Sequence, residues 1–184
     1  MCTKFNRKQR GISLVELVMF IVIVSLGIVG ILSVMNVTSK SSADPLQRKQ
    51  AIAVAESLLE EIELQAFTFC DPDDPNASVA TSAAGCTTPQ GLGPTAGETR
   101  YTNSRFDNVG DYDGFAMTGG IRDIFNVGIV GLETFNATVT MAQDGAIFSL
   151  PAADVLRIDV RVTSGPTDVT ISGYRFRYAP RAVP

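Results

Sequence analysis

The feature that most constrains this chain is a long apolar run from Ile12 to Met35, broken only by small residues and one carboxylate. As an α-helix at ~1.5 Å per residue, the run would be about 36 Å long, enough to cross a hydrocarbon core of about 30 Å. Basic but no acidic residues precede it, so the positive-inside rule keeps the N-terminus in the cytoplasm and exports everything after Lys40. The carboxylate, Glu16, lies early in the run, where an ionisable group is costly and therefore a functional candidate.

Composition excludes several classes of function. The chain has no histidine, which removes imidazole as a catalytic base or metal ligand. Four of the 15 basic residues precede Gly11, so the rest of the chain carries 11 basic against 19 acidic groups. An acidic body without a basic stripe argues against nucleic-acid binding. No phosphate-binding loop or nucleophile elbow is visible, and we expect neither an enzyme nor a cofactor.

The residues around Gly11 carry the most specific pattern. A secretory signal peptide has a shorter apolar core and a cleavage site after it, whereas the candidate site here precedes the run. The basic segment, Gly11, the apolar start, Glu16 and the long run together resemble the type IV prepilins and pseudopilins. This resemblance implies that prepilin peptidase cuts between Gly11 and Ile12 and methylates Ile12, which makes Glu16 the fifth residue of the mature chain. The sequence departs from the family in starting with isoleucine and in lacking a proline midway along the run, where Gly27 and Gly30 are the weaker points.

The position of Glu16 can be explained if its carboxylate forms an ion pair with another molecule. A carboxylate in apolar surroundings must be neutralised by a partner or by a proton. The methylated amine of Ile12 on a neighbouring pilin subunit would supply the positive charge, and an unpaired member would cost about 3–5 kcal/mol. We therefore expect the N-terminal helix to leave the inner membrane and pack with other pilin subunits in register. A protonated or snorkelling Glu16 without a partner is the alternative.

A second helical segment is expected from 36 to 67. Asp44 as N-cap and Pro45 at the first helical position predict a fresh helix start, with a kink or break near Ser41–Asp44. An apolar stripe predicts one face packed on a domain: Ile52, Ala55, Leu59, Ile62 and Ala66. The glutamates are expected on a solvated face: Glu56, Glu60, Glu61 and Glu63.

Cys70 and Cys86 follow this helix in the exported part, where disulfides form. Their pairing would contribute about 3 kcal/mol by the chain-entropy model, and two free thiols are the alternative. Further along, Asp107, Asp111 and Asp113 are spaced as D-x3-D-x-D, and closely spaced carboxylates in a loop can bind calcium. A surface loop explains this spacing equally well, so we assign no metal and keep these three as candidates for calcium.

From Leu132 onward the apolar period changes to two, which predicts antiparallel strands around Phe135–Met141, Leu156–Thr163 and Thr170–Tyr178. The last two strands should form a hairpin over Ser164–Thr167. In the last strand we expect three aromatics on the buried face: Tyr174, Phe176 and Tyr178. The arginines would then lie on a solvated outer face, paired across strands with Asp159: Arg157, Arg161, Arg175 and Arg177.

These inferences predict an α+β fold in which one long N-terminal helix packs its second half on a small antiparallel sheet. The expected segments are a leader (1–11), a transmembrane assembly helix (12–35), an amphipathic helix (36–67), a disulfide loop and connecting region (68–131) and a C-terminal sheet (132–184).

Several stretches narrow the resemblance to the D-type minor pilins of the mannose-sensitive haemagglutinin (MSHA) pilus, chiefly Ser42–Pro45, Phe69–Pro75 and Phe106–Tyr112. This resemblance implies a single-pass inner-membrane protein that later joins a periplasmic or extracellular pilus for adhesion or motility. The alternatives are a pseudopilin of a type II secretion system and a membrane-tethered periplasmic binding module.

Overall fold

The computed structural model describes residues 11, 13–95, 97–101 and 103–183, which fall into two units, Met1–Pro45 and Leu46–Pro184. Helix α1 (Leu14–Glu63) contributes to both units. In the first unit, α1 is exposed at every residue from Leu14 to Met35. An 18-residue stretch within these 22 residues has a mean hydropathy of 2.9, and the helix is long and apolar enough to cross a membrane. By length and composition, this agrees with the expected apolar helix.

The predicted helix start at Asp44 is wrong. The backbone is helical without a break through Ser41–Asp44, and Pro45 lies inside α1. A proline within a helix removes one backbone hydrogen bond, because it has no N–H to donate. The residues that follow Pro45 favour helix strongly, among them Leu46, Gln47, Arg48, Lys49 and Ala51, so one lost bond does not end the helix here.

The second unit contains a four-stranded antiparallel sheet in the order β1 (Ala116–Met117), β2 (Asn136–Gln143), β3 (Val155–Ser164) and β4 (Thr167–Phe176). Strands β2 to β4 are the three that the alternating pattern predicted. Strand β1 pairs two residues with β2 and is too short to show a period. Strands β3 and β4 form the predicted hairpin, in which Ser164 pairs with Thr167 across a turn containing Gly165 at φ 54°.

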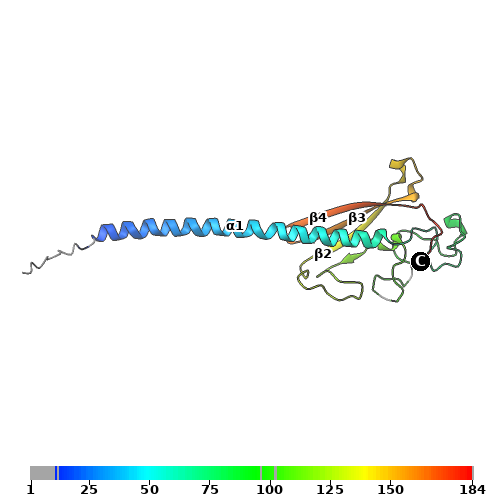
Figure 1. Ribbon diagram of the computed structural model, residues 1–184, viewed down its shortest axis with the longest axis horizontal. Coiled ribbons are helices and arrows are strands. Elements are labelled where there is room, and N and C mark those ends of the chain that lie inside the picture. Colours follow the sequence, from blue (N-terminus) through cyan, green and yellow to red (C-terminus); the bar gives the residue numbers. More distant parts are fainter. Residues whose placement is uncertain (1–10, 12, 96, 102, 184) are drawn as a thin grey trace, which may run out of the picture. The chain divides into compact units, whose positions relative to one another are not determined.

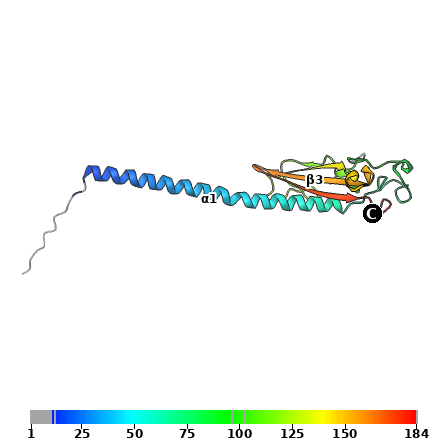
Figure 2. The ribbon, with the colours of Figure 1, turned by 90° about the horizontal axis from the view of Figure 1, so that it is seen from above.

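The part of α1 from Leu46 to Glu63 covers one face of this sheet (Figures 1 and 2). Its buried side chains are Ala51, Ala55, Leu58 and Ile62. They meet the alternating residues of the sheet: Ala137, Val139, Leu156, Ile158, Val160 and Val162. The two alanines allow the helix to lie close to the strands. This confirms the α+β fold of a helix packed on a small sheet.

The predicted inward face of β4 is wrong. Because antiparallel partners share a face, the pairing of Ile158 with Gly173 and of Leu156 with Arg175 places Gly173 and Arg175 on the helix side. The aromatics occupy the opposite face, where Tyr174 and Phe176 pack edge-on against Phe148.

Two contacts explain why arginines occupy the inner side at this end of β4. Arg175 donates to the backbone carbonyl of Gln65, where α1 has ended and carbonyls lack helical partners. The guanidinium of Arg177 lies 4.2 Å from the ring centroid of Phe67 and 3.4 Å from the carboxylate of Asp154. The alternating pattern of the sequence could not predict arginines on this side of the sheet, because arginine is expected on the solvent side unless a specific acceptor binds it inside.

The expectation that all four arginines lie on one solvated outer face is therefore wrong. Arg157 pairs with Asp159 on its own strand, at 3.1 Å, and with Asp144. Arg161 pairs with Asp168 across the hairpin.

Long loops connect α1 to β2 and contain two 3₁₀ turns, η1 (Ala83–Gly85) and η2 (Val109–Tyr112). Two more 3₁₀ turns, η3 (Gly145–Phe148) and η4 (Ala152–Asp154), lie between β2 and β3. The expected disulfide between Cys70 and Cys86 is present. Cys70 is fully buried with Ala77 and Ala80 in a small separate core.

Candidate functional site

The N-terminal motif lies at the start of α1. Gly11 is exposed, and Ile12, the expected first residue of the mature chain, lies outside the described residues. Glu16 is in the first turn of α1 and exposed. A carboxylate there is favoured by the helix dipole. None of the ion pairs found in the described part of the chain includes Glu16, which leaves its charge available to another molecule.

The apolar helix presents few polar groups besides Glu16. The Ser25 hydroxyl donates to the carbonyl of Ile21 at 2.7 Å, so it is satisfied within the helix. A Cβ added at Gly27 or at Gly30 would meet no atom within 4 Å. The helix is unbroken at both glycines, which were the expected weak points. Such a surface suits lipid or the apolar helices of other subunits.

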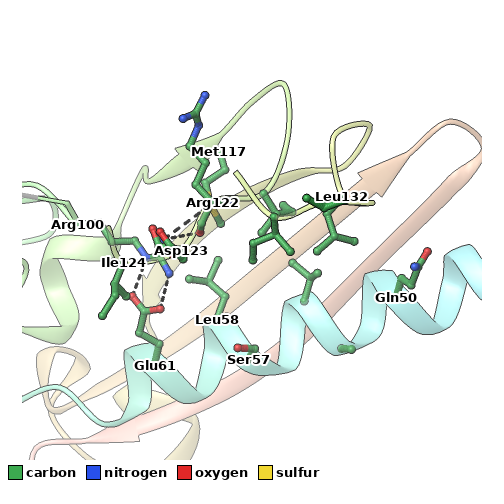
Figure 3. A pocket seen from close by; sticks show the side chains of 15 residues that line it. Gln50, Ser57, Leu58, Glu61, Arg100, Met117, Arg122, Asp123, Ile124 and Leu132 are labelled. Atoms are coloured by element: carbon green, nitrogen blue, oxygen red, sulfur yellow. Dashed lines mark hydrogen bonds and ion pairs between the residues drawn. The ribbon is translucent and has the colours of Figure 1, made fainter. Parts of the chain in front are cut away.

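Glu61 and Arg100 connect the second half of α1 to the loops. Arg100 Nε donates to Glu61 Oε1 at 2.7 Å, and its Nη2 donates to Oε2 at 2.6 Å (Figure 3). Tyr112 Oη also donates to Glu61, and Arg100 Nη1 donates to the carbonyl of Arg122. Burial alone would lower the pKa of Arg100, but the hydrogen bonds and charge of Glu61 raise it overall. The expectation that Glu61 is solvated is therefore wrong.

Beside this pair lies a groove of about 580 Å³ between α1 and the 117–132 segment (Figure 3). Its walls are mostly apolar, with Val54 and Leu58 from the helix, Met117 from β1, and Ile121 and Leu132 from the loops. The loop that forms its rim also exposes large apolar side chains, including Phe125 and Val130. Sequence reasoning missed this groove because the rim segment has no apolar period.

The structure separates the three aspartates of the D-x3-D-x-D spacing. Asp111 is fully buried and accepts backbone N–H groups from Asp107 and Asn108, so its carboxylate caps η2. Asp113 Oδ1 accepts the N–H of Met141 on β2 at 2.7 Å. Of the three, only Asp107 belongs to a group of carboxylates whose oxygens lie within 4.8 Å of one another.

Asp107 instead joins Asp71, Asp73 and Glu98, and one carboxylate oxygen from each of the four lies within 4.8 Å of the others. Burial, and after it the charge of Glu98, raises the pKa of Asp107 to about 7. Burial also raises the pKa of Glu98. The sequence signal for this group was the density of acids in the loop, but its members come from three separated positions.

The comparisons agree with the N-terminal motif. Residues 6–32 match the family model described as the prokaryotic N-terminal methylation motif. No curated protein and no solved structure matches the chain. The motif implies processing by prepilin peptidase and assembly with other pilins, and the apolar helix with this motif suggests single-pass anchoring in a membrane. The match covers the N-terminal motif alone, which is the part of the chain that resembles the type IV prepilins and pseudopilins.

Proposed function

We propose that this chain is a minor pilin subunit of a type IV pilus of the MSHA kind, with no catalytic activity of its own. One observation carries the proposal. A methylation motif opens an apolar helix that is exposed at every residue from Leu14 to Met35, and the same helix continues to Glu63, where it covers a folded sheet. The exposed half suits a filament core, and the covered half presents a globular domain at the filament surface.

The proposed sequence of events follows from the motif. The chain inserts in the inner membrane with its basic leader in the cytoplasm. Prepilin peptidase cuts between Gly11 and Ile12 and methylates the new amine. The amine then pairs with the Glu16 carboxylate of a neighbouring subunit as the helix leaves the membrane. The pair sets the register, because burying either charge without the other is strongly unfavourable.

Mass spectrometry of the N-terminus, combined with the protein content of sheared filaments, tests this function. We expect a chain that begins at methylated Ile12 and is present in filaments at a small fraction of the major subunit. Gly11→Glu should leave the leader in place and keep the chain in the membrane. Gly91→Glu, at an exposed loop glycine with no atom near a new Cβ, is the matched control and should be processed normally.

The same experiment separates the alternatives. A methylated chain found with a secretion complex and absent from pili would identify a type II secretion pseudopilin. An intact leader in the inner membrane would favour a tethered periplasmic binding module. Either result would contradict the minor pilin.

A further inference from the structure

The rim loop, from Ile121 to Leu132, borders the groove beside α1 and exposes large apolar side chains. The side chain of Val130 is 92% exposed and that of Phe125 is 70% exposed. Loops are normally polar, and an apolar patch on a protein surface marks contact with another protein, a ligand or a membrane. Five large apolar side chains of the rim loop are exposed: Ile124, Phe125, Val127, Ile129 and Val130.

The backbone of the rim loop is hydrogen-bonded within the loop itself. The Asp123 N–H donates to the Val127 carbonyl at 3.0 Å, and the Ile129 N–H donates to the Ile121 carbonyl at 2.9 Å. Asp123 Oδ1 accepts the N–H groups of Phe125 and Val127, at 2.9 and 2.8 Å. Backbone groups that are already bonded can enter an apolar medium at a much lower cost than free ones. The tip is therefore a defined turn that can leave water.

Two arginines flank this apolar tip. The guanidinium of Arg105 lies 5.6 Å from the ring centroid of Phe125, and Arg122 Nη1 donates to a backbone carbonyl of the same turn at 3.1 Å. Both arginines are exposed, and neither forms an ion pair with a carboxylate of the described chain. The nearby acids, Asp123 and Glu133, already accept backbone N–H groups. Apolar side chains edged by cations are typical of surfaces that bind anionic lipid.

The chain itself keeps this loop near a membrane. The candidate membrane span ends at Met35, and the second unit begins at Leu46. Only residues 36–45 lie between them, and ten residues reach at most about 36 Å even when fully extended. A tether of this length gives the bilayer a high effective concentration at the surface of the second unit. A bilayer is therefore the apolar partner that the rim loop meets first.

We propose that the rim loop docks on the surface of the membrane that holds α1. Phe125 and Val130 enter the boundary between head groups and acyl chains, and Arg105 and Arg122 bind anionic phosphates of the head groups. The long arginine side chains suit this position, because they can keep their charge at the phosphate level while their stems lie in apolar surroundings. This inference goes beyond the proposed pilus function and rests only on the anchoring of α1, so it applies equally to a pseudopilin.

A single tryptophan tests the contact, because the chain has none of its own. The full chain with Phe125→Trp is reconstituted in vesicles of phosphatidylethanolamine and phosphatidylglycerol, with and without brominated acyl chains as quenchers. We expect the brominated lipid to lower the tryptophan fluorescence at least about twofold, because the side chain lies at the acyl boundary. Val79→Trp, at an exposed position in the loop that the disulfide closes, is the matched control and should not be quenched.

Further substitutions in the Phe125→Trp chain separate lipid contact from a structural effect. Val130→Ser changes a side chain that is 92% exposed, so it should leave the fold intact and still weaken the quenching. Val79→Ser is its control and should leave the quenching unchanged. Arg105→Gln with Arg122→Gln should lower the quenching to the level found in vesicles of phosphatidylcholine alone, because both changes remove the attraction to anionic lipid.

Two results would overturn the proposal. Equal quenching in the Phe125→Trp and Val79→Trp chains would show that the rim loop has no preference for the bilayer. Protection of the rim loop from aqueous iodide that is lost when the chain is diluted with more lipid would identify a second copy of the chain as the partner. Neither measurement requires cleavage at Gly11 or filament assembly, so failure of this proposal and failure of the minor pilin are recognised separately.

Discussion

Arg100 donates two parallel hydrogen bonds, of 2.7 and 2.6 Å, to the carboxylate of Glu61, and only 7% of the arginine side chain is exposed. The pair joins α1 to a loop 39 residues further along the chain. Bidentate charge-assisted bonds are among the strongest in proteins and also fix geometry. This contact therefore determines how the loop that borders the apolar groove lies against the helix.

Breaking this pair should destabilise the globular unit. Glu61→Gln leaves Arg100 buried without a counter-charge, and we expect a loss of about 2–3 kcal/mol in the free energy of unfolding. This loss is smaller than the ~3–5 kcal/mol expected when one partner of a fully buried ion pair is removed, because the Glu61 side chain is 23% exposed. Chemical denaturation of residues 46–184 measures it, since the main core runs from Ala51 to Val169 and this fragment keeps all of it. Glu60→Gln, on the exposed side of α1, is the control; an equal loss in both variants would contradict the pair's role.

Gly173 on β4 faces the side chains of Leu59 and Glu63 on α1. A Cβ at this position would lie 3.0 Å from Leu59 Cδ1 and would overlap Glu63 Oε1. We expect Gly173→Val to cost about 1–3 kcal/mol by overpacking, measured on the same fragment. Thr170→Val lies on the exposed outer face of β4 and should change stability little. A neutral Gly173→Val would mean that the side chains of Leu59 and Glu63 rotate aside, so that the glycine is not needed for the packing of β4 on the helix.

The disulfide should stabilise the fragment by constraining its unfolded state. Replacing both cysteines, Cys70→Ser with Cys86→Ser, should lower the free energy of unfolding by about 3 kcal/mol. Reductant should lower the stability of the unmodified fragment by a similar amount and leave the double variant unchanged. If reductant affects both proteins equally, the bond is not the cause.

The sequence revealed those parts of the fold whose burial follows a simple period. Strands β2 and β3 alternate cleanly, because one face meets the helix and the other meets solvent. The apolar stripe of α1 also predicted Ala55 and Ile62 in the core, although Ala51 and Leu58 are buried more deeply than Ile52 and Leu59.

The misjudged elements are those where a specific partner overrides the period. Arg175 is drawn inward by a free carbonyl at the end of α1, which turns the β4 aromatics outward against Phe148. Glu61 has a distant partner in Arg100 that no local pattern indicates. The acidic cluster likewise unites residues that are 36 positions apart in the chain, from Asp71 to Asp107. Such pairings depend on loop paths, which have no periodic signal in the sequence.

Glu16 supplies the sharpest test of assembly. It is exposed, lies in the first turn of an apolar helix and has no ion-pair partner among the residues that the structure places. We expect Glu16→Ala to be cut and methylated at Ile12 and to insert in the membrane, because the apolar run remains intact. It should be depleted from sheared filaments at least about tenfold, since the neighbouring amine would be buried unpaired.

Glu16→Gln keeps the size of the side chain and should fail similarly if charge, rather than shape, sets the register. Ser25→Ala, whose hydroxyl bonds only within the helix, should assemble normally. Immunoblots of membrane and filament fractions provide the measurement, and normal incorporation of Glu16→Ala would refute the pairing.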